Sequence, residues 1–294
     1  MNEQIYEIGI AARIKMNAHS LNNEGTTGNV TEPRTVVLAD GRKTDGISGE
    51  MLKHIHAAYL FHLAKEEKEN SLCESCKSFN PMKADGNSKL KGKSVVDALN
   101  EALSCELCDI HGFLVQEPTL SRKSTVEFGW ALALPEQFHR DIHVHTRVAP
   151  GEKTREKGVS EQMIYNRPTR SGVYAFISVF QPWRIGLNEV NYTYKINDPI
   201  RKKRYDLAID SYKSMFTRIE GAMTTTRMPH IEDIEGVMIK TDDAQPVPLI
   251  SPLKEDYIKE IEKISQSVQK FTSLSELLKA LDNLKQTSPY KLGA

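Results

Sequence analysis

Four cysteines constrain this chain more than any other feature of its sequence. They form two C-x-x-C pairs, Cys73 with Cys76 and Cys105 with Cys108, with residues 77–104 between them. One such turn presents two thiolates to a tetrahedral ion, and a second turn completes the coordination sphere, so we expect a structural Zn²⁺. The ion would replace a missing local core in the polar stretch 66–93. Four unligated thiols or a redox pair are the alternatives, and His111 could replace one thiolate.

The small number of cysteines also bears on where the protein works. Four thiols in 294 residues are too few for a secreted chain stapled by disulfides, and they suit a reducing cytosol. The start of the chain, Met1-Asn2-Glu3-Gln4, lacks the order of a signal peptide, and no apolar run approaches the about 20 residues of a membrane span. We therefore expect a cytoplasmic, globular protein with no membrane partner.

The hydrophobic pattern predicts an α+β fold in which helices cover one sheet. Residues 6–15 alternate as a strand does, and Ser48 offers an N-cap to a helix over 49–68. Further helices are expected over 95–103, 205–219 and 257–271, with a capping box at Ser273 opening a last one. Strands are expected at 35–38, 113–115, 125–134, 142–148, 162–165 and 173–180.

This pattern places the whole chain, 1–294, in one domain with three insertions. Residues 18–46 read as a loop or small hairpin, because glycines and polar residues surround one short strand candidate. Residues 66–112 carry the cysteine pairs. Residues 140–166 include a charged stretch bounded by Gly and Pro at 149–158, which predicts a protruding hairpin tip.

Charge excludes a molecule-wide attraction to polyanions. Lys plus Arg equals Asp plus Glu at 39 each, so any affinity for nucleic acid must come from a local patch. Scattered basic and polar side chains could hold phosphates, although from spacing alone an ordinary solvated surface is equally supported. The candidate RNA-binding residues are Arg13, Lys15, Asn17, Arg34, Ser48, Lys53, His54, Arg122, Lys123, Arg167 and Arg170.

Motifs for catalysis are weak. The sequence has no G-x-S-x-G, H-E-x-x-H or phosphate-binding loop. His143 and His145 share one face of an expected strand near Asp141, which leaves a metal-dependent RNA endonuclease as the alternative hypothesis. A DNA-binding regulator would need a helix-turn-helix, and none is apparent. The aromatic strand around Tyr174 and Phe176 loosely follows an RNA-recognition pattern, but a core role is favoured.

Several segments resemble the CRISPR-associated autoregulator family DevR over about residues 6–185. The resemblance is carried by Arg34-Thr35-Val36-Val37, by Ile47 to Tyr59, by Ser124 to Leu134 with Phe128-Gly129-Trp130-Ala131, and by Glu161 to Tyr165 leading to Ser171 to Phe176. Members of this family form the repeated backbone subunit of type I Cascade, particularly the archaeal-type I-A and I-B complexes.

The resemblance implies an RRM-like (ferredoxin-like) palm sheet, a helical fingers insertion and a β-hairpin thumb. It implies a non-catalytic subunit whose copies stack along crRNA, grip its phosphates and leave guide bases free to pair with target DNA. Partners would then be crRNA, neighbouring copies and other Cascade subunits, with target DNA bound through the guide. The residues that resemble guide-gripping positions are Arg13, Lys15, Asn17, Ser48, Lys53 and His54. Residues 142–165 are the expected thumb, and the loop 18–45 is a competing candidate.

Overall fold

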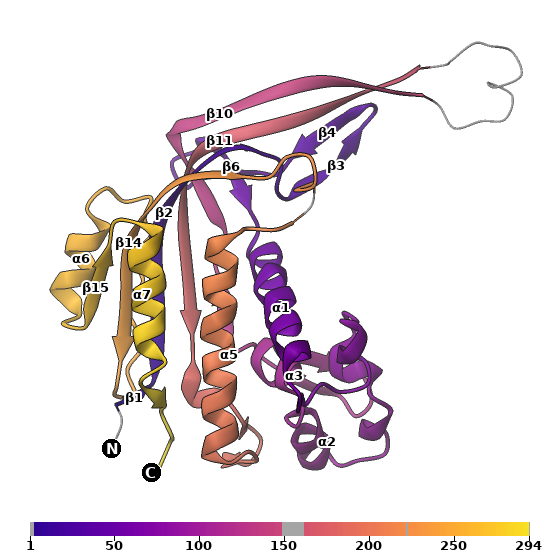
Figure 1. Cartoon of the computed structure of the whole chain (residues 1–294), viewed down its shortest axis with the longest axis vertical. Coiled ribbons are helices and arrows are strands. Elements are labelled where there is room, and N and C mark those ends of the chain that lie inside the picture. Colours follow the sequence, from indigo (N-terminus) through magenta and orange to yellow (C-terminus); the bar gives the residue numbers. More distant parts are fainter. Residues whose placement is uncertain (1–2, 149–161, 222, 294) are drawn as a thin grey trace, which may run out of the picture.

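One large, mostly antiparallel sheet organises the chain, as Figure 1 shows. The structure is a computed structural model that describes residues 3–148, 162–221 and 223–293, without the side chains of 147, 148, 162 and 163. The sheet order is β15-β14-β2-β11-β10-β6-β5. The architecture is mixed α/β, which confirms the predicted combination of strands and helices in its general form.

The centre of the sheet is β2 (Glu7–His19), the strand that the alternating N-terminal pattern predicted. It pairs antiparallel with β14 (His230–Thr241) on one side and with β11 (Gln162–Phe180) on the other. Next to β11 lies β10 (Ala131–Val148). The outer strands of the path are β15 (Val268–Phe271), β6 (Lys43–Ile47) and β5 (Thr35–Val37).

Strands β10 and β11 are much longer than the sequence pattern predicted. The separate strands expected at 125–134 and 142–148 are largely joined in β10, and those at 162–165 and 173–180 are joined in β11. The register is shifted between Ala133 and Phe138, which bends the ladder. Beyond this bend the two strands leave the body as a projecting hairpin (Figure 1), and their pairing continues to Val148 and Gln162. The charged tip predicted at 149–158 lies outside the described residues.

Three helices cover one face of the sheet (Figure 1): α1 (Gly49–Glu66), α5 (Asp198–Thr217) and α7 (Leu274–Leu284). Helix α1 begins where the sequence predicts, because the Ser48 side chain accepts a hydrogen bond from the Met51 amide at 3.3 Å. Gly49 permits its close packing, since a Cβ there would lie 2.3 Å from the carbonyl oxygen of Phe128. Helix α6 (Tyr257–Ile264) lies on the opposite face, where Tyr257 and Ile261 pack with Val237.

The main core fills the space between the sheet and α1, α5 and α7. Tyr174, Phe176 and Phe180 of β11 are all buried in it, which confirms that this aromatic strand serves the core. Phe176 packs edge-on against Phe216 of α5, with ring centroids 5.3 Å apart. The sheet face that carries Ile8, Ile10, Ala12, Ile14 and Met16 of β2 is therefore the inner one.

Residues between α1 and the second half of the sheet form a compact side unit of short elements. These are η1 (Cys76–Ser78), η2 (Lys83–Gly86), η3 (Ser88–Leu90), α2 (Val95–Ala102), α3 (Glu106–His111), β7 (Phe113–Val115) and β8 (Leu120–Arg122). The remaining elements are β1 (Gln4–Ile5), β3 (Asn23–Thr27), β4 (Val30–Pro33), β9 (Val126–Phe128), η4 (Pro182–Arg184), β12 (Leu187–Asn188), β13 (Thr193–Tyr194) and β16 (Ser288–Pro289). Within the described ranges, no helix has the length and apolarity needed to cross a bilayer.

A buried carboxylate joins this side unit to the body. Asp109 of α3 is fully buried and binds Arg122 through Oδ1 at 2.6 Å and Arg204 of α5 through Oδ2 at 2.7 Å. The Gly186 amide donates to the same carboxylate at 3.0 Å. One anion therefore compensates two buried guanidinium groups from different parts of the chain.

We predict that Asp109→Ala will lower the free energy of unfolding by about 3–5 kcal/mol, because two buried guanidinium groups lose the buried carboxylate that they share. Denaturant unfolding followed by circular dichroism measures this. As a control, Asp282→Ala removes a partly exposed partner of Lys213 and should cost no more than about 1 kcal/mol. Equal losses in the two variants would contradict the role of Asp109.

Candidate nucleic-acid interface and metal centre

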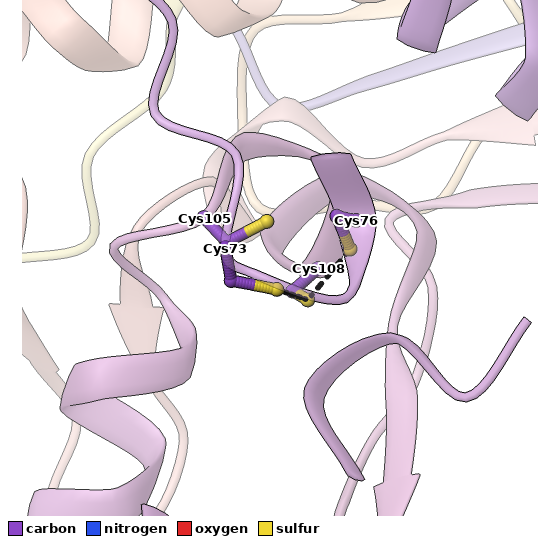
Figure 2. A group of neighbouring side chains, drawn as sticks. All are labelled: Cys73, Cys76, Cys105 and Cys108. Atoms are coloured by element: carbon purple, nitrogen blue, oxygen red, sulfur yellow. Dashed lines mark hydrogen bonds between the residues drawn. The ribbon is translucent and has the colours of Figure 1, made fainter. Parts of the chain in front are cut away.

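The two cysteine pairs meet in the side unit. Cys73 lies before η1 and Cys76 begins it, while Cys105 occupies the N-cap position of α3 and Cys108 lies within that helix. The four sulfurs all lie within 4.8 Å of one another, with Cys76 and Cys108 at 3.6 Å and Cys73 and Cys108 at 3.9 Å. Figure 2 shows the four side chains turned toward a common centre. Tetrahedral thiolates at about 2.3 Å from a zinc ion are about 3.8 Å apart, so this arrangement is compatible with a structural metal.

The chemistry of the cluster also suits a cation. None of the four cysteines forms a disulfide. Hydrogen bonding among the four thiols lowers the pKa of Cys73 and Cys105 and raises that of Cys76 and Cys108, so the negative charge of the group is concentrated on the first two sulfurs. His111, the alternative ligand, is not in the cluster, because its Nε2 contacts Nδ1 of His56 at 3.0 Å. Three of the cysteines are buried and Cys73 is half-buried, which is typical of a closed structural site.

A second site lies beneath the projecting hairpin. It is a cavity of about 620 Å³ between the hairpin and the segment that leads into β14. We call it the hairpin cavity; its lining residues include His143, His145, Tyr165, Arg167, Thr169, Thr224, Thr226, Arg227 and His230. No carboxylate occurs among the described residues that line it. A cavity that has arginine and histidine side chains but no acidic group favours an anionic ligand.

The side chains of the hairpin cavity are already ordered by one another. The Tyr165 ring lies parallel to the His145 ring at 5.5 Å, and the Arg167 guanidinium lies 4.8 Å from the centre of the same tyrosine ring. Arg227 donates a hydrogen bond to Nε2 of His145 at 2.6 Å. Partial burial of the imidazole, followed by the positive charge of Arg227, holds the pKa of His145 below its ordinary value.

A third site, the helix-start cavity, lies at the first turn of α1 and has a volume of about 670 Å³. Lys53, Lys83 and Lys123 line it, together with Trp130. Burial lowers the pKa of Lys53 and lowers that of Lys83 to about 8. The carboxylates of Glu50, Asp85 and Glu127 line the same cavity, so its charge is mixed, in contrast to the hairpin cavity.

The structure separates most of the predicted RNA-binding residues. Arg13, Lys15 and Asn17 project from β2 on the side of α6, whereas Ser48, Lys53 and His54 belong to α1 on the other face. The Arg13 guanidinium donates to the carbonyls of Pro252 and Lys254. Lys15 and Asn17 both bind Glu232. These three side chains are thus occupied by contacts within the protein.

The other predicted residues fall into different surroundings. Arg167 lines the hairpin cavity, and Lys53 and Lys123 line the helix-start cavity. Arg34 pairs with Glu24 and lies 5.6 Å from the Trp130 ring. Ser48 is buried as the cap of α1, and the exposed His54 packs against Phe79. The structure therefore brings together only parts of the predicted set.

Two of the predicted RNA-binding arginines are interior residues, and this corrects their assignment. Arg122 is 3% exposed and binds Asp109. Arg170 is fully buried at the base of the hairpin, where it binds Asp45 at 2.7 Å. Spacing along the sequence cannot separate a buried, paired arginine from an exposed one, because both can follow a strand in the same way. Neither guanidinium is accessible to a phosphate in this fold.

The residues proposed for a nuclease do not form a metal site. His143 Nε2 contacts the Thr169 hydroxyl at 2.7 Å, and His145 accepts from Arg227. Asp141 does not line the hairpin cavity. Across the described residues, the cysteine cluster is the single group of three or more His, Cys, Asp or Glu side chains with ligand atoms close enough for one ion.

Sequence reasoning missed four residues of these cavities: Tyr165, Arg227 and His230 in the hairpin cavity, and Lys83 in the helix-start cavity. Arg227 follows three threonines in a connection between a helix and a strand, which is the kind of segment that often carries function. That signal was available. The meeting of this connection with β10 and β11 depends on long-range packing and had no sequence signal.

Comparisons with known proteins agree with this architecture. A solved chain titled "CRISPR RNA-guided surveillance complex" has the same overall fold, with a TM-score of 0.53 and 12% identity over 95% of this chain and 98% of that one. Two curated proteins named CRISPR-associated protein Cas7/Cst2/DevR are each 26% identical. The one from Methanocaldococcus jannaschii matches over 89% of both chains, and the one from Thermoproteus tenax over 84% of this chain and 78% of its own.

The solved chain and the two curated proteins all carry CRISPR in their names, and this chain is similar to each of them. The family model described as "CRISPR-associated negative auto-regulator DevR/Csa2" matches residues 10–262. The chain belongs to this DevR family, as the sequence resemblance indicated.

Proposed function

We propose that this protein is a non-catalytic backbone subunit of a type I Cascade complex, which binds crRNA by its phosphates and leaves the guide bases free to pair with target DNA. The observation that carries the proposal is the hairpin cavity: arginine and histidine side chains converge on it from three elements, and no carboxylate lines it among the residues that the structure describes. Membership of the DevR family supports the CRISPR context. Because base pairing supplies sequence specificity in such machines, the protein needs to recognise only backbone charge and shape.

An RRM-like palm is part of this proposal. The order β2, α1, β10, β11, α5, β14 follows the β-α-β-β-α-β order of ferredoxin-like folds. The spatial order β14-β2-β11-β10 supports the same assignment. In this view β10 and β11 extend from the palm as the thumb, and the cysteine-containing side unit corresponds to the fingers.

The phosphate-binding roles fall on cations that line the two cavities. Arg167 and Arg227 would hold phosphates in the hairpin cavity, where Arg227 comes from outside the predicted set. Lys53 and Lys123 would extend the path into the helix-start cavity. Arg122 and Arg170 have structural roles instead, because both are buried and paired.

We predict that Arg167→Gln combined with Arg227→Gln will weaken binding of single-stranded RNA at least about tenfold, because two charged hydrogen-bond donors are lost. The loss should be the same for different guide sequences. The slope of log affinity against log salt should fall by about 1.4, or about 0.7 for each phosphate contact. Fluorescence anisotropy over a salt series measures both quantities.

The control removes two exposed lysines elsewhere, with Lys259→Gln in α6 and Lys279→Gln in α7. It lowers the net charge equally and should change affinity by less than about threefold. An equal loss in both double variants would show that the hairpin cavity has no special role. Loss for only one guide sequence would argue against phosphate binding.

Assembly of copies along RNA is supported by exposed apolar surfaces. The hairpin exposes Ile142, Val144 and Ile164 by 52%, 68% and 56%. Met82, Leu114 and Trp130 are exposed at the helix-start cavity, elsewhere on the chain. The hairpin is a projecting apolar surface, and the helix-start cavity is a concave one elsewhere on the same molecule. Two such surfaces suit a head-to-tail contact, which can repeat from copy to copy as an open filament.

We predict that Val144→Lys with Ile164→Lys will reduce the number of copies bound to a long RNA, because charge would be placed in the apolar contact. Native mass spectrometry measures the copies per RNA, and a short RNA that holds one copy tests whether binding itself survives. Val190→Lys changes a similarly exposed valine in the connection after β12 and should leave the copy number unchanged. Unchanged stoichiometry in the double variant would exclude this surface as the contact.

We also propose that the cysteine cluster holds a structural Zn²⁺ through Cys73, Cys76, Cys105 and Cys108. The sulfur separations and the burial of the group support this assignment. When bound, the ion would tie η1 to α3 without offering a position for substrate. These four residues therefore stabilise the side unit rather than take part in chemistry.

We predict about one zinc per chain by elemental analysis of the purified protein. Cys73→Ser should remove most of the metal and lower the melting temperature by about 5 °C or more, because the side unit loses its cross-link. Ser88→Ala, an exposed change in the same segment, should alter neither property. A wild-type protein that contains no zinc and is unaffected by a chelator would exclude the site.

A further inference from the structure

One hydrogen bond fixes the protonation state of a histidine in the hairpin cavity. Arg227 stays positively charged and can only donate, so His145 must offer a lone pair at Nε2. His145 is therefore neutral in this arrangement, with its proton on Nδ1. The contact joins the connection before β14 to the projecting hairpin, and Arg227 is only 9% exposed.

The surroundings of His145 make its protonation unfavourable while the cavity holds no anion. The titratable or charged groups that line the cavity are His143 of β10, Tyr165 and Arg167 of β11, Arg227 of the preceding connection and His230 of β14. Two of these are permanent cations, and no carboxylate among the described lining residues offsets them. Burial together with the charges of Arg227 and Arg167 accordingly lowers the pKa of His145.

We propose that His145 takes up a proton when an RNA phosphate enters the hairpin cavity, so that RNA affinity depends on pH through this residue. A phosphate would accept the hydrogen bond that Arg227 now gives to His145, and a protonated imidazole would donate a second one to the same anion. The anion thereby removes both obstacles to the charged form, the donor at Nε2 and the excess of positive charge. This inference rests on the proposed RNA-binding function and adds a specific role for one residue.

The direction of the pH dependence follows from linkage. Because the phosphate favours the charged imidazole, the pKa of His145 is higher in the complex than in the free protein. Affinity therefore rises as pH falls through the window between these two pKa values and is constant outside it. One coupled proton gives at most about a tenfold gain in affinity for each pH unit.

The test measures the affinity for a fluorescent oligouridine from about pH 8 to about pH 6 at constant salt, a range in which phosphodiesters do not titrate. The wild-type protein should bind about three- to tenfold more tightly at the acidic end. His145→Gln keeps a group that can accept from Arg227 but cannot gain a proton, so most of the gain should disappear. His139→Gln on the same strand lies outside the cavity lining and should retain it.

A second measurement needs no variant. Proton NMR of the His145 imidazole should show its pKa rising when oligouridine is added. An equal pH slope in the wild type and His145→Gln, or an imidazole pKa that RNA leaves unchanged, would overturn the inference while RNA binding itself stands. Absence of RNA binding at every pH and at low salt would instead overturn the proposed function.

Discussion

The antiparallel pairing of β10 with β11 is the constraint on which the rest of the structure depends. At one end the pair lies in the sheet and buries Tyr174 and Phe176, and at the other it projects as the hairpin. A buried ion pair holds the transition: Arg170 binds Asp45 of β6, and the Tyr174 hydroxyl donates to the same carboxylate at 2.7 Å. Charges that are removed from water in this way are costly to separate, so the hairpin leaves the body at a fixed place.

The partners of the basic side chains divide them into two groups with different roles. Arg122, Arg170 and Arg204 are interior, and each is paired with a buried aspartate. Arg167 and Arg227 line a cavity without a lining carboxylate in the described part of the chain. A neutral protein can still present a local positive surface, because charges of the two signs are distributed unevenly over it.

The side unit shows how a polar segment becomes ordered. Its helices and 3₁₀ turns are short, and the segment before Val95 has few apolar residues to bury. Two kinds of contact compensate for this: the cysteine cluster within the unit and the Asp109 network toward α5. The helix-start cavity, with Trp130 at its rim, lies between this unit and α1, so the stability of the unit and the shape of that surface are linked.

The sequence by itself determined the local elements: the N-capped α1, the alternating β2, the aromatic core strand and the capping box of α7, because these depend on neighbours a few residues apart. It also indicated that the cysteines could form one cluster, because two C-x-x-C pairs supply the four thiols that a single tetrahedral ion needs. Only the tertiary structure decided that β10 and β11 are continuous, that Arg122 and Arg170 are buried, and that Arg13 and Lys53 lie on opposite faces of the sheet. It also brought Arg227 to His145. The Arg170–Asp45 and Arg227–His145 pairs join residues 125 and 82 positions apart, and their energies depend on burial and charge that no local pattern records.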